Sequence, residues 1–170
     1  MADSARITYT NIARQSFWNL YNLINNRSNI PDPNNSAGTR KFVYQSRIPN
    51  LGRNFAGFPF ILVSRSKPSK GKTTADLSKK FHSFDFTVTV YSQDTDSDSS
   101  GNPSGAETAD TITNSIINTL DNPTNRKTLL NYLMGSLEYD IDTNEDELEG
   151  KAVFITEFDI RFENNLIKSA

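Results

Sequence analysis

The chain of 170 residues contains no cysteine, which excludes disulfide bonds and thiolate metal sites. Its one histidine, His82, leaves a histidine-based metal or catalytic site with few partners in the chain. It has no apolar run of about 18 residues, and the N-terminal MADSARITYT lacks the apolar stretch of a signal peptide. We therefore expect no membrane association, no cofactor and assembly in the cytoplasm.

The chain also lacks an excess of basic charge. The formal net charge is -2 at pH 7, whereas a general nucleic-acid binder carries a basic excess. Apolar residues make up 35% of the chain, and Asn, Ser, Thr and Asp fill long polar segments. Eleven Phe and six Tyr are available for the core, and the length predicts a single domain over residues 1–170.

Two long segments alternate apolar and polar residues, which predicts strands with one buried face. They are Phe81–Tyr91 (FHSFDFTVTVY) and Lys151–Glu163 (KAVFITEFDIRFE). Between them, Ser104 and Glu107 have the spacing of a capping box and open an amphipathic helix. The predicted core comprises Phe84, Phe86, Val88, Val90, Ile112, Ile116, Leu120, Phe154, Phe158, Ile160 and Phe162.

The remaining elements follow from shorter patterns. We expect a helix over Thr10–Arg27, strands over Phe42–Arg47, Phe58–Arg65 and Leu137–Ile141, and a short helix that Thr124 caps and Gly135 ends. The order is α-β-β-β-α-(α)-β-β. Strands with one polar face predict an α+β fold: a mostly antiparallel sheet with helices packed on one face.

Three polar segments are expected to be loops. Ser66–Lys80 is basic and reads as a flexible arm, while Gln93–Gly105 and Asp142–Gly150 read as acidic loops. We expect the arm to be mobile in the free subunit and ordered in an assembly, where it contacts an acidic surface of a neighbouring subunit. The interface residues expected in and beside the arm are Arg65, Lys67, Lys70, Lys72, Lys79 and Lys80.

Motifs for other chemistry are incomplete. Gly71-Lys72-Thr73 resembles the end of a phosphate-binding loop, but Ser66 stands where that motif needs glycine. The acidic runs that begin at Asp94 and Asp140 resemble calcium loops but lack the glycine at position six and the glutamate at position twelve. No metal site is therefore predicted, although a small calcium-binding module remains an alternative.

Acid–base catalysis is a further alternative. Asp85, Glu157 and Asp159 would lie near each other if their two strands pair. A solvated or interface-forming sheet face explains these carboxylates equally, and no nucleophile or metal motif accompanies them. We expect a protein that is not an enzyme and has no catalytic residues.

In the order and residue pattern of several segments, the chain resembles the tail terminator (tail-completion) proteins of long-tailed bacteriophages. The segments are FPFILVSRS, the long arm, FDFTVTVYSQD, the helix ETADTITNSIINTL, a late Gly-Lys and a closing strand that ends in FDIRF. The resemblance extends from about Phe42 onward. The two acidic loops depart from the family pattern, so no contact residue is carried over.

The resemblance implies a mixed sheet with helices on one face and a hexameric ring in the neck of the virion. Such a ring caps the finished tail tube and meets a head-side connector or stopper protein, and DNA passes its lumen only as cargo. A head-to-tail connector, a stopper or a tail tube subunit are alternatives within the same class.

Overall fold

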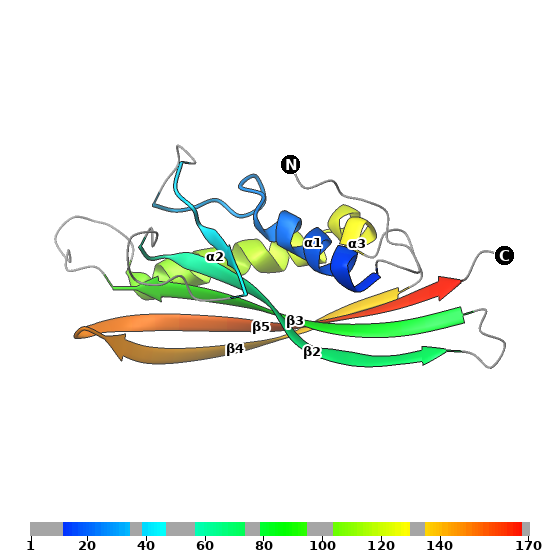
Figure 1. Ribbon diagram of the computed structural model, residues 1–170. Coiled ribbons are helices and arrows are strands. Elements are labelled where there is room, and N and C mark those ends of the chain that lie inside the picture. Colours follow the sequence, from blue (N-terminus) through cyan, green and yellow to red (C-terminus); the bar gives the residue numbers. More distant parts are fainter. Residues whose placement is uncertain are drawn as a thin grey trace.

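The computed structural model describes the backbone of residues 12–34, 39–46, 57–73, 79–94, 104–129 and 135–167. Side chains are described over 14–34, 39–46, 57–65, 83–94, 104–129 and 136–163. The elements are α1 (Ile12–Ile24), β1 (Val43–Gln45), β2 (Phe60–Thr73), β3 (Lys79–Gln93), α2 (Gly105–Asp121), α3 (Pro123–Leu129), β4 (Gly135–Leu148) and β5 (Lys151–Ile167) (Figure 1). Their order is the predicted one.

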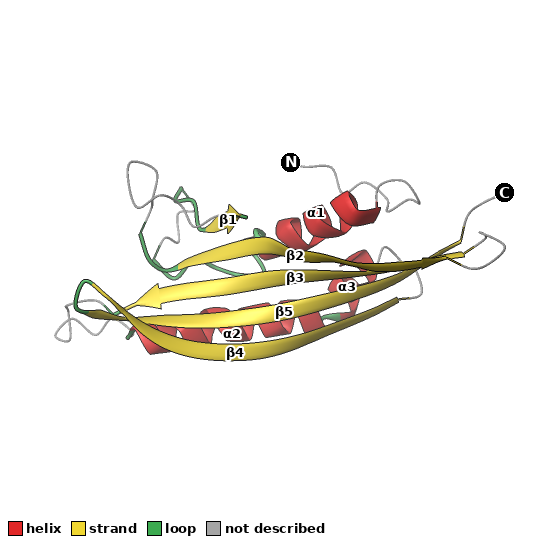
Figure 2. Cartoon of the chain, turned by 60° about the horizontal axis from the view of Figure 1, so that its bottom comes forward, coloured by secondary structure: helices red, strands yellow, loops and turns green. Residues whose placement is uncertain are grey.

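The five strands form one sheet in the order β1-β2-β3-β5-β4. The short strand β1 runs parallel to β2, and the other neighbouring pairs are antiparallel. All three described helices lie against one face of the sheet, and the other face is left open by them (Figures 1 and 2). The predicted α+β class, with a mostly antiparallel sheet and helices on one face, is confirmed. None of these helices has the length and apolarity to cross a membrane.

The core lies between the helices and the covered face of the sheet. Alternate residues of β3 and β5 enter it, and the buried stripe of α2 packs on them because its apolar residues recur at helical spacing. Of the predicted core, the buried residues are Phe86, Val88, Val90, Ile112, Ile116, Leu120, Phe158, Ile160 and Phe162. Phe84 and Phe154 are only half-buried.

The start of α2 is fixed by local chemistry. The Ser104 hydroxyl accepts a hydrogen bond from the Glu107 amide, and the Glu107 carboxylate accepts one from the Ser104 amide, which confirms the capping box. The Gly105 amide donates to the Asp94 carboxylate at 2.7 Å, and a Cβ at Gly105 would lie 2.7 Å from the Asp94 amide nitrogen. A side chain at position 105 would therefore collide with the backbone at the end of β3, so the first residue of α2 must be glycine. The cap of α3 was predicted wrongly: the Asn122 side chain, not Thr124, accepts the first amides.

A buried ion pair holds the connection between α1 and β1. The Arg40 guanidinium donates to both carboxylate oxygens of Asp32, at 2.9 and 3.1 Å, and also to the carbonyls of Gly57 and Phe58. The Asp32 side chain has no exposed surface, and that of Arg40 is 13% exposed. The sequence-based interpretation treated this segment as an ordinary polar loop and missed the pair.

Two of the predicted loops are largely strand. β2 continues to Thr73 and β3 begins at Lys79, so the expected arm over residues 66–80 is mostly a β-hairpin, with Lys72 opposite Phe81. β4 continues to Leu148, and only Glu149 and Gly150 form the turn of the expected acidic loop 142–150. Both extensions are held by backbone pairing with a neighbouring strand. Most of the third expected loop, residues 95–103, lies outside the described residues, as do residues 74–78 of the arm.

Candidate functional site

The open face of the sheet carries a concentration of carboxylates. Alternation along β5 places Phe158 and Ile160 in the core and Glu157, Asp159 and Arg161 on the opposite, exposed side, as predicted. Neighbouring β4 adds exposed carboxylates in register with them. We call the following set the acidic surface: Glu138, Asp140, Asp142, Glu157 and Asp159.

Within the acidic surface, like charges lie directly opposite one another. Asp140 is the cross-strand partner of Asp159, and Asp142 is the partner of Glu157. Like charges at directly opposed positions destabilise an antiparallel pair, whereas opposite charges stabilise it. Two such pairs in adjacent rows therefore give this part of the sheet an unfavourable local field, which a cationic partner would relieve.

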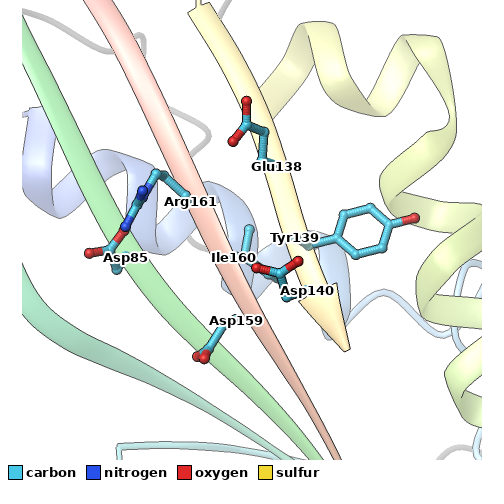
Figure 3. A pocket seen from close by; sticks show the side chains of 7 residues that line it. All are labelled: Asp85, Glu138, Tyr139, Asp140, Asp159, Ile160 and Arg161. Atoms are coloured by element: carbon cyan, nitrogen blue, oxygen red, sulfur yellow. The ribbon is translucent and has the colours of Figure 1, made fainter. Parts of the chain in front are cut away.

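A shallow depression of about 320 Å³ overlaps the acidic surface, since Glu138, Asp140 and Asp159 line it (Figure 3). Asp85 and Arg161 also line it: Arg161 Nε donates to Asp85 Oδ1 at 2.9 Å, and this hydrogen bond and charge raise the pKa of Arg161. One row further along, the Thr87 hydroxyl donates to Asp159 Oδ1 at 3.2 Å. Figure 3 shows Arg161 directed toward Asp85, away from Asp140. Arg161 is therefore already engaged, and the carboxylates of β4 lie on its other side.

The same open face ends in an aromatic cluster near β1. The rings of Phe60 and Tyr91 stack with centroids 4.7 Å apart, and Tyr44 meets Phe60 edge-on at 5.8 Å. Leu62 is buried with them, and Phe58 packs against the group. Burial and the nearby charge of Glu157 raise the pKa of Tyr91. This end of the face is therefore apolar and largely buried, and the exposed carboxylates lie on β5 and β4.

The predicted interface residues separate into two groups. Arg65 is exposed, and its guanidinium lies 4.6 Å from the ring centroid of Phe17 in α1, a contact within the chain that the sequence did not suggest. Lys67, Lys70 and Lys72 belong to β2, and Lys79 and Lys80 to β3. Their side chains lie outside the described residues. Their backbone positions place all five in the hairpin that β2 and β3 form, and their interface role stays a prediction.

The structure also bears on the alternative chemistries. Gly71 and Lys72 lie in a strand, not in a turn between a strand and a helix, so the phosphate-loop geometry is not present. Asp140, Asp142 and Asn144 follow one another along extended β4, whereas a calcium loop must fold around its ion. Among the described side chains, no group of three or more His, Cys, Asp or Glu could hold a metal ion. The pairing of β3 with β5 does bring Asp85, Glu157 and Asp159 to one face, as expected, but Asp85 is taken by Arg161.

A scan of the sequence against models of protein families finds no match, and a search of curated proteins finds no significant relative. The chemistry of the site is therefore argued from its geometry. An open, exposed and strongly acidic sheet face suits the binding of cationic side chains over a broad area, since it offers charge without an enclosed cavity.

Proposed function

We propose that this protein is a tail terminator, a virion protein without enzymatic activity that forms a ring on the end of a finished tail tube. In this role the ring, of six subunits, joins the tube to the head-side connector or stopper protein. The observation that carries the proposal is the half-covered sheet. All three described helices pack on one face (Figure 2), and the other face exposes the carboxylates of β4 and β5.

A ring subunit needs a rigid element with charge-complementary surfaces more than it needs a pocket. The long strands supply the rigidity, since β3 pairs with β5 at fifteen successive positions from Lys79 to Gln93. The fold also agrees with the fold that the resemblance to tail terminator proteins implies. The net charge of -2 would disfavour adhesion of DNA that passes through the lumen.

The test is to locate the protein in particles. Antibodies against the purified chain, coupled to gold, should label virions at the junction of head and tail, and native mass spectrometry of the disrupted neck should give a six-subunit ring. Label along the tail would favour a tail tube subunit instead, and label on the head side of the junction would favour a connector or stopper. Particles that contain none of the protein would refute the proposal.

A further inference from the structure

The chain carries two strongly charged regions of opposite sign that its own sheet keeps apart. The acidic surface lies on β4 and β5. The segment of paired strand ends, residues 70–73 of β2 and 79–82 of β3, carries Lys70, Lys72, Lys79 and Lys80 and no acidic residue. We refer to this segment as the basic hairpin.

The antiparallel order places the two regions at different positions along the sheet. Thr87 pairs with Asp159 in the middle of the acidic surface, whereas Lys80 pairs with Leu166 near the end of β5. Lys80 precedes Thr87 by seven positions in the same strand, which corresponds to about 23 Å at ~3.3 Å per residue. A paired strand cannot fold back over that distance, so the basic hairpin cannot neutralise the acidic surface of its own chain. A second copy can.

Protection of a sheet edge does not explain the acidic surface completely. β4 is an edge strand, and charged residues on such a strand prevent indiscriminate pairing with other chains. Glu157 and Asp159 lie on β5, however, which has a neighbour on both sides. Their placement opposite Asp142 and Asp140 adds repulsion without protecting any edge.

We infer that the acidic surface of one copy binds the basic hairpin of a second copy of this chain. The contact joins two different surfaces, so it is heterologous: each copy uses its hairpin on one neighbour and its acidic surface on the other. Interfaces of this type generate a ring when the rotation closes. The inference rests on the ring of the proposed function, for which it names the surfaces between subunits.

The edge of β2 favours contact through side chains over extension of the sheet by backbone pairing. Its pairing with β3 is irregular at two places, between Arg65 and Pro68 and between Pro68 and Gly71. Proline and irregularities of this kind discourage an additional strand from pairing at an edge. The basic hairpin is therefore expected to lie across the acidic surface as a charged arm.

Purified full-length protein provides the test, with self-association measured by sedimentation velocity at several salt concentrations. Wild type should associate at low salt and dissociate as salt screens the contact. A surface variant, Asp140→Lys with Asp142→Lys, and a hairpin variant, Lys70→Glu with Lys72→Glu, should each associate about tenfold more weakly or worse. The matched control for the surface variant is Asp110→Lys with Asn114→Lys and Asn118→Lys. It makes the same change in net charge as the surface variant, but on the exposed side of α2, and should associate like wild type.

Mixing the two variants gives the sharpest result. The surface variant keeps a basic hairpin and the hairpin variant keeps an acidic surface, so these two surfaces attract each other. The reversed positions, 140 and 142 in one variant and 70 and 72 in the other, are also opposite in sign, so the mixture should form mixed complexes that neither variant forms alone. Thermal melting of the surface variant should show no loss of stability, because lysines opposite Glu157 and Asp159 replace like-charge pairs by opposite-charge pairs.

Wild type that stays monomeric at low salt, or variants that associate as wild type does, would overturn the inference. So would a mixture of two folded variants that fails to form the complex. These results concern purified protein alone. The proposed function is judged by the position of the protein in particles, so the two ideas can fail separately.

Discussion

Strand β5 presents the two faces of the sheet in one stretch of sequence. Its covered face buries Phe158, Ile160 and Phe162 against the helices, with exposed fractions of 0 to 1%. Its open face exposes Glu157, Asp159 and Arg161, which alternate with them in the sequence. The difference separates two tasks: the covered face stabilises the fold, and the open face is available for a partner.

Two ion pairs among the described residues follow the same division. Asp32 and Arg40 form a pair with almost no exposed surface, and the guanidinium also donates hydrogen bonds to the carbonyls of Gly57 and Phe58. Asp85 and Arg161 pair on the open face, with side chains 33% and 58% exposed. Water screens the exposed pair but not the buried one. Breaking the buried pair should therefore lower the stability of the fold more than breaking the exposed pair.

The largest effect is expected from the covered face. Replacing Phe158 by Ala should lower the free energy of unfolding by about 3–5 kcal/mol, because a fully buried ring is removed and its site cannot collapse completely. The matched control is the preceding residue, Glu157→Ala, which should change it by less than about 0.5 kcal/mol. Urea denaturation of both variants measures the difference. Equal losses of stability would show that the two faces of β5 do not differ as described.

The covered face is also the part of the fold that the sequence predicted. Alternation in FDFTVTVY and FITEFDIRF identified β3 and β5 and their buried residues, because burial of one face imposes an apolar residue at every second position. The capping box of α2 was visible for a similar reason, since Ser104 and Glu107 satisfy local amides.

The parts that were missed have no such pattern. In the later halves of β2 and β4, SKPSKGKT and DTNEDEL contain almost no apolar residues. Along β4 beyond Tyr139 both faces are exposed, and Ile141 is 41% exposed. Strands held by backbone pairing alone give no hydrophobic periodicity, so they read as loops. The acidic surface was only partly predicted as a result, since Asp142 was assigned to a loop and the register of β4 on β5 was unknown.

The second prediction compares the two ion pairs. Asp32→Ala should destabilise the protein by about 3 kcal/mol or more, because it leaves the guanidinium of Arg40 largely buried without its counter-charge. Asp85→Ala removes the exposed pair with Arg161 and should leave the melting temperature unchanged. Calorimetric melting of both variants at neutral pH tests this. A loss of equal size in the two variants would contradict the division between covered and open faces.

The smallest effect is expected where the helix cover of β4 ends, at Tyr139. Its hydroxyl donates to Asp121 Oδ2 at 3.0 Å at the end of α2, and burial together with that carboxylate raises its pKa above the usual 10.0. At neutral pH, Tyr139→Phe should therefore cost only about 0.5–1 kcal/mol, the net contribution of one hydrogen bond.

The pH dependence of Tyr139 has a defined sign. A raised pKa means that the folded state holds the phenol proton more tightly than the unfolded state does, so the associated stability is present below pH 10.0 and is lost as the pH rises above it. Tyr139→Phe should lose less stability than wild type over that alkaline range, and Asp121→Asn, which keeps an acceptor without the charge, should lie between them. Tyr21 and Tyr91 also have raised pKa values, so some loss persists in every variant. Melting temperatures from neutral to alkaline pH measure these slopes, and identical profiles for wild type and Tyr139→Phe would show that this contact does not link α2 to the edge of the sheet.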